Sequence, residues 1–232
     1  MTHFVCFPSA RIDMAYSCAK EWEQKGYIPL VMLDPPTRAV LFAPCTVIEG
    51  PSPFPGYYQV INQIARSAFL FGADVCTFIG DDMTPPKQGA EEHTLRYFAR
   101  FPDGYGMMQC TGDRQGEKIG GKVNSERICG SPTFGRGWHE KAFGGTGGFP
   151  TAFSSFYADE VLKEVAERLG LLYQEPDLTI DHLHWSFGRS VRQPYHERAE
   201  KNWQQDQAVF MKYKAEDFST MLATFPGVSN KC

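Results

Sequence analysis

The sequence predicts an α/β protein built on a mixed, mostly parallel sheet, and three short apolar runs carry this prediction. Residues 3–7 and 28–33 have the length and composition of buried strands. Between them, apolar residues recur at helical spacing until Gly26, which suits a helix end. Strand, helix and strand with short links form a βαβ unit, so the two strands should be parallel. Residues 75–79, VCTFI, match a central strand that is covered on both faces.

The remaining pattern extends this unit along the first half of the chain. Apolar positions predict helices over residues 57–71 and 89–99. Residues 39–48 suit a short strand or hairpin, and residues 105–110 suit a strand. A glycine-containing polar loop is expected over residues 111–126.

The second half predicts fewer strands and ends in helices. A helix is expected over Asp159–Leu169, with Gly170 as its stop, and residues 171–174 and 178–184 look extended. The last forty or so residues are charged and helical, with one apolar stripe formed by Trp203, Val209, Phe210 and Tyr213. We therefore predict a catalytic domain over residues 1–190 and a helical C-terminal extension over residues 191–232, packed on it.

Composition narrows the class of protein. The net charge of −4 gives no global basic field that would attract nucleic acid, although basic residues gather in residues 114–127. The seven cysteines form no CxxC pair, and several lie in apolar runs, so buried thiols in a reducing compartment are expected. No apolar run approaches the ~18 residues of a membrane span, and no signal peptide is visible. We expect a cytoplasmic protein that does not use a membrane.

The run FIGDDMTPP is the strongest chemical signal. It ends a predicted buried strand in Asp81 and Asp82, at the sheet edge where ligands of open α/β proteins bind. Adjacent carboxylates repel unless a cation lies beside them, and their hard oxygens suit Mg²⁺ or Mn²⁺. Such an ion would neutralise a diphosphate. The alternative interpretation is a solvated Asp-Asp turn.

The run DLTIDHLHW is the second signal. On an extended segment, His182 and His184 point to one face, where they would complete a metal shell or bind a phosphate. The alternative is one packed core histidine and one surface histidine.

Two further features are weaker. Asp159 and Glu160 open a predicted helix, where the dipole keeps a carboxylate ionised; this is a common helix cap and also a way to hold a general base. Pro8, Arg11 and Asp34 follow the first two strands, where a nucleoside or phosphate would lie.

Together these motifs resemble the GT-A glycosyltransferases, especially the family 2-like group and its small phage and bacterial members. The shared features are the βαβ start, a helix with Asn62, IGDDM, ICGSPTFGRGWHEKAFGG, YADEVLKEVAERLG and DLTIDHLHWSFG, over roughly residues 3–190. The first acid of the usual DxD-type motif is Gly80 here, and the last matches Asp82. The resemblance implies a GT-A fold, with a small-residue strand and a helix before Gly144-Gly145.

The resemblance also implies roles for the candidate residues. Asp82, together with His182 or His184, would bind Mn²⁺ or Mg²⁺. The following residues would border the donor: Pro8, Arg11, Asp34, Asn62 and Asp81. Asp159 would be the base of an inverting reaction, with Glu160 as the alternative.

The expected activity is transfer of a sugar from a nucleoside diphosphate sugar, with UDP preferred, to an acceptor hydroxyl. Hydroxymethylated phage DNA bases, glycans and proteins are the candidate acceptors. A sugar-phosphate nucleotidyltransferase is a rival, but FPSAR lacks the expected glycine-rich phosphate loop. A non-catalytic carbohydrate-binding protein on a degenerate scaffold is a second rival.

Overall fold

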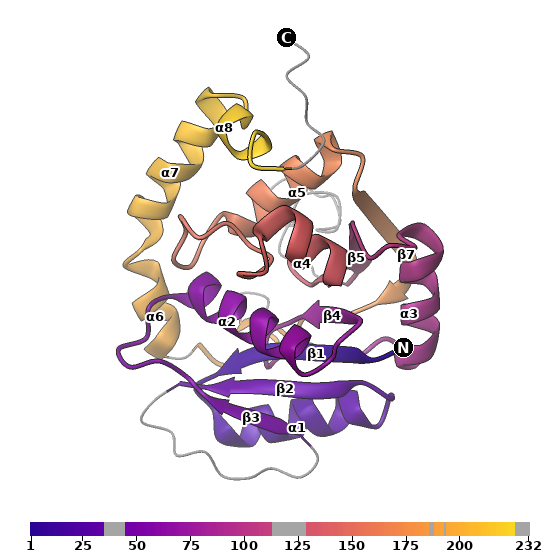
Figure 1. Cartoon of the computed structure of the whole chain (residues 1–232). Helices are drawn as coiled ribbons and strands as arrows, with labels where there is room; N and C mark the ends of the chain where they lie inside the picture. Colours follow the sequence, from indigo (N-terminus) through magenta and orange to yellow (C-terminus); the bar gives the residue numbers. More distant parts are fainter. Residues whose placement is uncertain (35–44, 113–128, 186–187, 193, 226–232) are drawn as a thin grey trace.

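A computed structural model describes residues 1–34, 45–112, 129–185, 188–192 and 194–225. Within this part of the chain, seven strands form one sheet in the order β3-β2-β1-β4-β6-β5-β7 (Figure 1). The strands are β1 (His3–Ser9), β2 (Ile28–Leu33), β3 (Thr46–Glu49), β4 (Val75–Phe78), β5 (Met107–Thr111), β6 (Pro132–Gly135) and β7 (Leu172–Thr179). The α/β prediction is confirmed.

The sheet is parallel except at one strand. β1 pairs in parallel with β2 and β4, β2 with β3, and β5 with β7. β6 lies between β4 and β5 and is antiparallel to both. The carboxyl ends of β1, β2 and β4 therefore share one edge, which is where the acidic motif emerges.

Helices cover both faces of the sheet. α1 (Ile12–Glu23) and α3 (Gly89–Arg100) pack on one face, and α2 (Tyr57–Leu70), α4 (Arg136–Phe143) and α5 (Ala158–Arg168) pack on the other. β1 shows why its sequence suits this place. Phe4 and Cys6 enter one core and Val5 and Phe7 enter the other, as the period of two in a strand requires.

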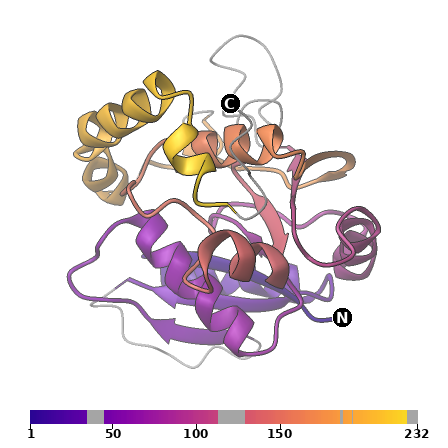
Figure 2. The ribbon, with the colours of Figure 1, turned by 45° about the horizontal axis from the view of Figure 1, so that its top comes forward.

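The C-terminal extension consists of α6 (Pro194–Glu200), α7 (Trp203–Ala215) and α8 (Ser219–Leu222), drawn in yellow tones beside α5 in Figure 2. Val209, Phe210 and Tyr213 of α7 pack against the core that contains α2 and α5. Phe218 and Met221 are buried in that same core. The apolar stripe predicted for this extension thus packs on the body, although Trp203, at its start, stays 44% exposed.

A polar network lies between α3 and the sheet. The ring nitrogens of His93 contact the Tyr27 hydroxyl at 2.9 Å and the Thr133 hydroxyl at 3.0 Å. Those of His3 contact the hydroxyls of Thr94 at 2.8 Å and Thr77 at 2.8 Å. Complete burial lowers the pKa of His93 to about 3, so this imidazole is neutral in the folded protein.

Several element predictions need correction. The expected extended segments 171–174 and 178–184 are one strand, β7, which ends at Thr179, with a register shift opposite Cys110 and Thr111. Residue-level patterns did not predict β6 and α4, which the resemblance did place before Gly144. The expected strand over 39–48 appears only as β3, since residues 35–44 lie outside the described residues.

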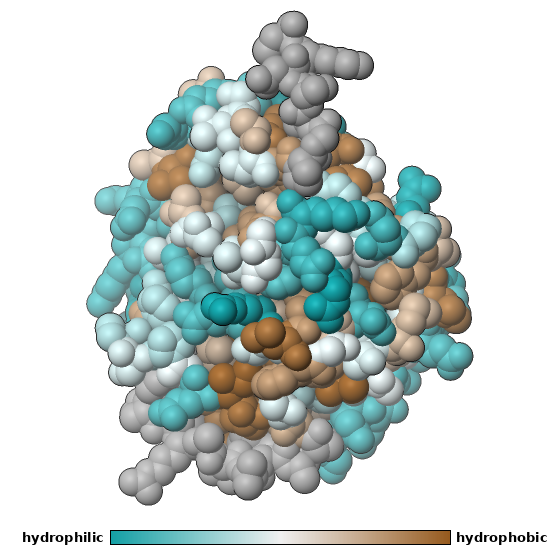
Figure 3. All heavy atoms as spheres, in the orientation of Figure 1, coloured by the Kyte–Doolittle hydropathy of each residue, from teal (hydrophilic) through white to brown (hydrophobic). Residues whose placement is uncertain are grey.

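The surface and the cysteines agree with a protein built around two buried cores. Figure 3 shows hydrophobic side chains gathered over the region of α2, framed by hydrophilic ones. Five cysteines are buried and free, as predicted: Cys6, Cys18, Cys76, Cys110 and Cys129. Among the described residues, no helix has the length and apolar character of a membrane span.

Candidate functional site

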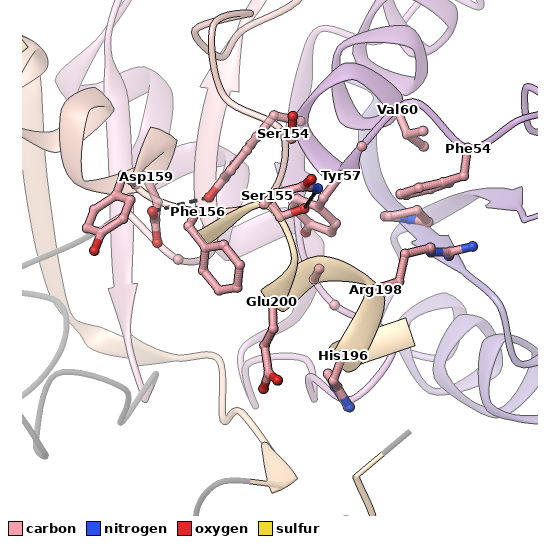
Figure 4. Close-up of a pocket in the computed structure, with 18 of the residues that line it drawn as sticks. Phe54, Tyr57, Val60, Ser154, Ser155, Phe156, Asp159, His196, Arg198 and Glu200 are labelled. Carbon is pink, nitrogen blue, oxygen red and sulfur yellow. Dashed lines mark hydrogen bonds between the residues drawn. The ribbon is translucent and has the colours of Figure 1, made fainter. Parts of the chain in front are cut away.

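A cavity of about 1510 Å³ lies at the carboxyl ends of the parallel strands. Its floor comes from the ends of β1, β2 and β4, with Ser9, Leu33 and Gly80 among the lining residues. Its other walls come from the segment before α5, the start of α2, and α6 with the start of α7. In Figure 4, Phe156 and Asp159 lie on one side and Phe54 and Arg198 on the other. The C-terminal extension therefore helps to form the cavity as well as packing on the body.

Asp82 meets His182 at the cavity floor. His182 Nε2 lies 3.3 Å from Asp82 Oδ1, and both side chains are nearly buried. The backbone brings them together, because His182 and Met83 form an isolated antiparallel β-bridge. In addition, the Leu183 amide donates to the Asp82 carbonyl at 2.8 Å. The Trp22 indole donates to the Met83 carbonyl at 2.9 Å and fixes the turn from the other side. The predicted convergence of the two motifs is present.

The environment keeps the Asp82 carboxylate ionised. Burial by itself raises the pKa of this carboxyl, but the hydrogen bond from His182 and the nearby His182, His184 and Arg11 bring the pKa below its usual value. Gly80 also contributes, since a Cβ at this position would lie 2.7 Å from Asp82 Oδ1. The glycine at this position thus leaves room for the Asp82 carboxylate.

Asp81 has a different place from Asp82. Its carboxylate accepts hydrogen bonds from the Ser9 hydroxyl at 2.5 Å and from Arg11 Nε at 3.1 Å, and Arg11 Nη2 forms an ion pair with it. Asp81 is 8% exposed, so this arrangement is largely withdrawn from solvent. It ties the loop after β1 to the acidic motif, and it satisfies a carboxylate that would otherwise repel Asp82.

Asp159 faces the cavity from the first turn of α5. The Tyr58 hydroxyl donates to Asp159 Oδ1 at 3.1 Å, and Tyr58 is 5% exposed. Burial and the charge of Asp159 raise the pKa of Tyr58, so the hydroxyl keeps its proton and remains a donor. Glu160 also lines the cavity, so both predicted acids reach it.

Two of the three residues predicted to border a nucleoside lie at the opposite wall, and the third, Arg11, is not among the lining residues. Pro8 and Asp34 line the cavity at the ends of β1 and β2. Arg198 of α6 donates to Asp34 Oδ2 at 2.5 Å and stacks over the Phe54 ring at 4.6 Å from its centre. The extension therefore closes over the strand ends at this point.

A row of rings continues from the floor toward α6. The ring centres of His182 and His184 are 4.9 Å apart, and those of His184 and His196 are 6.0 Å apart. Trp185 lies against both His184 and His196. His184 thus lines the cavity beside His182 as predicted, although the segment after Thr179 is not a strand.

Asn62 lies away from the lining residues. Its amide oxygen accepts the backbone N–H groups of Gly148 and Phe149, at 2.9 and 3.0 Å, and its amide nitrogen donates to the Phe149 carbonyl. A Cβ on Gly147 would lie 2.1 Å from the Asn62 oxygen. Asn62 therefore holds the GGTGG loop against α2, and the structure does not bring it to the other predicted donor residues.

Sequence reasoning missed two residues that shape the site. Asp206 of α7 is fully buried and accepts the backbone N–H groups of Ser154, Ser155 and Phe156, at 2.9, 2.8 and 2.9 Å. Tyr58 was read only as part of an amphipathic helix. Neither residue has a local sequence signal, because each acts on a segment at least fifty residues away in the chain.

Comparison with known proteins adds no family assignment. No protein-family model and no curated protein matches the chain. The site must therefore be judged on its own chemistry. In the part of the chain that the structure describes, no group of three or more His, Cys, Asp or Glu side chains is arranged to hold a metal ion.

Proposed function

We propose that this protein is a metal-dependent glycosyltransferase of GT-A type that transfers a sugar from a nucleoside diphosphate sugar, with UDP as the preferred nucleotide, to an acceptor hydroxyl. One observation carries the proposal. An ionised Asp82 beside His182 and a carboxylate at Asp159 line one large cavity at the carboxyl ends of parallel strands. This edge is where open α/β sheets bind nucleotides.

The donor set at Asp82 fits a divalent cation that also binds the substrate. One carboxylate oxygen and an imidazole nitrogen lie 3.3 Å apart at the cavity floor, with His184 next to them. Mg²⁺ and Mn²⁺ sites commonly use one or two carboxylates and take their remaining ligands from water and substrate phosphates. Asp82 with His182 or His184 would hold Mn²⁺ or Mg²⁺, and the ion would neutralise the diphosphate as it leaves.

The nucleoside has a place at the wall formed by Pro8 and Asp34. Asp34 is 11% exposed and can accept hydrogen bonds from a base or a ribose once Arg198 shifts toward a phosphate. Arg11 and Asp81 shape the loop between this wall and the cavity floor. Binding of the donor therefore uses residues at the carboxyl ends of β1, β2 and β4 and a residue of α6.

Asp159 is the proposed base. Its carboxylate takes the proton of the acceptor hydroxyl while that oxygen bonds to the anomeric carbon of the sugar. The bond from the anomeric carbon to the diphosphate oxygen breaks, and the nucleoside diphosphate leaves with the electron pair. A direct displacement of this kind inverts the anomeric configuration. The Tyr58 hydroxyl orients the carboxylate through its hydrogen bond to Oδ1.

The decisive experiment is turnover of a panel of UDP- and GDP-sugars with Mn²⁺, measured as release of nucleoside diphosphate. We expect hydrolysis of at least one donor, lost with EDTA and in Asp82→Asn. An absence of both turnover and metal-dependent nucleotide binding would refute the enzyme hypothesis. Formation of a new sugar nucleotide from a sugar phosphate and a nucleoside triphosphate would instead support the nucleotidyltransferase rival.

A further inference from the structure

We infer that the acceptor of this enzyme is a neutral carbohydrate whose ring stacks on Trp203, at a subsite built by the C-terminal extension; this inference rests on the proposed function. Trp203 is the first residue of α7 and lines the cavity with Phe156 and Asp159. Its side chain belongs to the same cavity wall as the proposed base.

The Trp203 ring is supported on one side and open on another. Its centre lies 4.9 Å from that of Phe156 and 5.0 Å from that of Tyr157. Despite these contacts the residue is 44% exposed. Among the described residues, the other exposed aromatic side chains, Tyr16 and Phe71, do not line the cavity. An aromatic face open to a cavity suits the apolar face of a sugar ring.

The support beneath this ring is rigid. Tyr157 has a left-handed backbone with φ of 67°, which is strained for a residue with a bulky side chain. Three neighbouring amides are held by Asp206, and the Tyr157 ring stacks on Phe210 at 4.9 Å with an interplanar angle of 16°. Both Asp206 and Phe210 belong to α7. The extension therefore fixes the Trp203 ring together with residues 154–157, the segment that leads into Asp159.

The charges favour a neutral acceptor over a nucleic acid. Arg189 and Arg192 pair with Asp181 and Glu200 at 2.7 and 2.6 Å, and Arg198 is assigned above to the donor. Carboxylates also outnumber lysines and arginines in the lining: the acids are Asp34, Asp81, Asp82, Asp159, Glu160, Glu164 and Glu200, and the bases are Lys163, Arg198, Lys201 and Lys214. A phosphate backbone binds where unpaired cations gather, which is not the character of this wall. The basic residues noted above in residues 114–127 lie outside the described residues.

The geometry gives the acceptor a defined task. With its ring on Trp203, a sugar occupies the wall from which Asp159 projects into the cavity. One of its hydroxyl groups then gives its proton to Asp159 as its oxygen bonds to the anomeric carbon of the donor, and the nucleoside diphosphate departs. Trp203 acts by binding and orienting the acceptor, and water can still reach the donor when no acceptor is present.

The test measures acceptor and donor kinetics separately in the full chain. With Mn²⁺ and the donor identified by hydrolysis, neutral nitrophenyl glycosides and a hydroxymethylcytosine oligonucleotide serve as acceptor probes. We expect transfer to at least one glycoside, with the acceptor KM raised about tenfold in Trp203→Leu, the factor that corresponds to about 1.4 kcal/mol. Trp203→Phe keeps an aromatic ring and should lose less.

Two controls separate binding from folding. Phe71→Leu removes an aromatic ring that is 57% exposed and lies outside the cavity, and it should leave the acceptor KM unchanged. Donor hydrolysis by water and the melting temperature should be nearly unchanged in Phe71→Leu, and a Trp203 variant that folds should still hydrolyse the donor while its acceptor KM rises. Trp203→Phe provides the comparison if Trp203→Leu fails to fold.

The outcomes distinguish failure of the acceptor subsite from failure of the proposed glycosyltransferase function. Hydrolysis of the donor with an acceptor KM that does not respond to Trp203 overturns the acceptor subsite and leaves the glycosyltransferase in place. Transfer to the oligonucleotide alone overturns the choice of a neutral acceptor. No donor turnover and no metal-dependent nucleotide binding would overturn both.

Discussion

Replacing Asp206 tests how the C-terminal extension holds residues 154–156, the segment before α5 and Asp159. In Asp206→Asn, an amide group replaces a carboxylate that accepts three backbone N–H groups. Ser155 and Phe156 share one oxygen and Ser154 uses the other, so either orientation of the amide turns at least one accepted bond into a contact between two donors. Asp206→Ala removes all three acceptors.

The cost follows from the burial of Asp206. Hydrogen bonds to a charged group contribute about 1.5–3 kcal/mol each, and a buried donor left unsatisfied costs about 1–3 kcal/mol. Because Asp206 is fully buried, water cannot replace it without rearrangement. We expect Asp206→Asn to lower the free energy of unfolding by about 2–4 kcal/mol, and Asp206→Ala by about 4–5 kcal/mol.

Urea unfolding at pH 7, followed by tryptophan fluorescence and circular dichroism, measures this change. The two probes should report one transition, and the dependence on urea should keep its slope. Glu23→Gln, at an exposed site on α1, is the matched charge-removing control and should stay within about 0.5 kcal/mol of the parent. A loss below that limit in Asp206→Asn would refute the argument that this carboxylate fixes the loop before α5.

Three further predictions test other parts of the structure. His93 is neutral in the folded protein, with a pKa of about 3 against 6.5 in the unfolded chain, so its contribution to stability is present above pH 6.5 and is lost as the pH falls. The free energy of unfolding should fall by about 2 kcal/mol between pH 7 and pH 5, and by less in His93→Gln. Equal pH dependence in the two proteins would contradict this. Gly80→Ala should displace the Asp82 carboxylate and weaken Mn²⁺-dependent nucleotide binding by about tenfold or more in calorimetry, and unchanged affinity would count against that crowding. Tyr58→Phe should lower kcat for transfer by about tenfold, with little change in donor KM. It should also move the acid limb of the pH-rate profile to higher pH. An unmoved profile would show that Tyr58 contributes packing alone and does not act on Asp159.

The sequence predicted the elements with regular patterns well. β1, β2 and β4 are short apolar runs buried at almost every position, and α2 and α5 have strong helical periodicity, so their positions could be read directly. β6 begins with Pro132 and spans four residues, PTFG, so it had no readable pattern of its own. Its antiparallel position between β4 and β5 depends on contacts far along the chain.

The candidate site could be predicted where the motifs themselves supply the chemistry. Asp82 and His182, a hundred residues apart, come together as the motifs suggested. The sequence could not show that Asp81 is engaged by Arg11 and Ser9, because a DD pair gives no sign of which carboxylate faces the cavity. Asn62 was expected to border the donor but lies away from the cavity. A polar residue on an amphipathic helix can equally accept hydrogen bonds from backbone amides of a distant loop, as Asn62 does.

In the proposed function, the Asp82 site holds a divalent cation together with a nucleoside diphosphate. Titration calorimetry of UDP and GDP into the full chain, with Mn²⁺ and then with EDTA, tests it most directly. We expect binding that requires Mn²⁺ and that is lost in both Asp82→Asn and His182→Ala, while Glu23→Gln binds as the parent does. Binding that is equally tight in EDTA, or unchanged in Asp82→Asn, would contradict it.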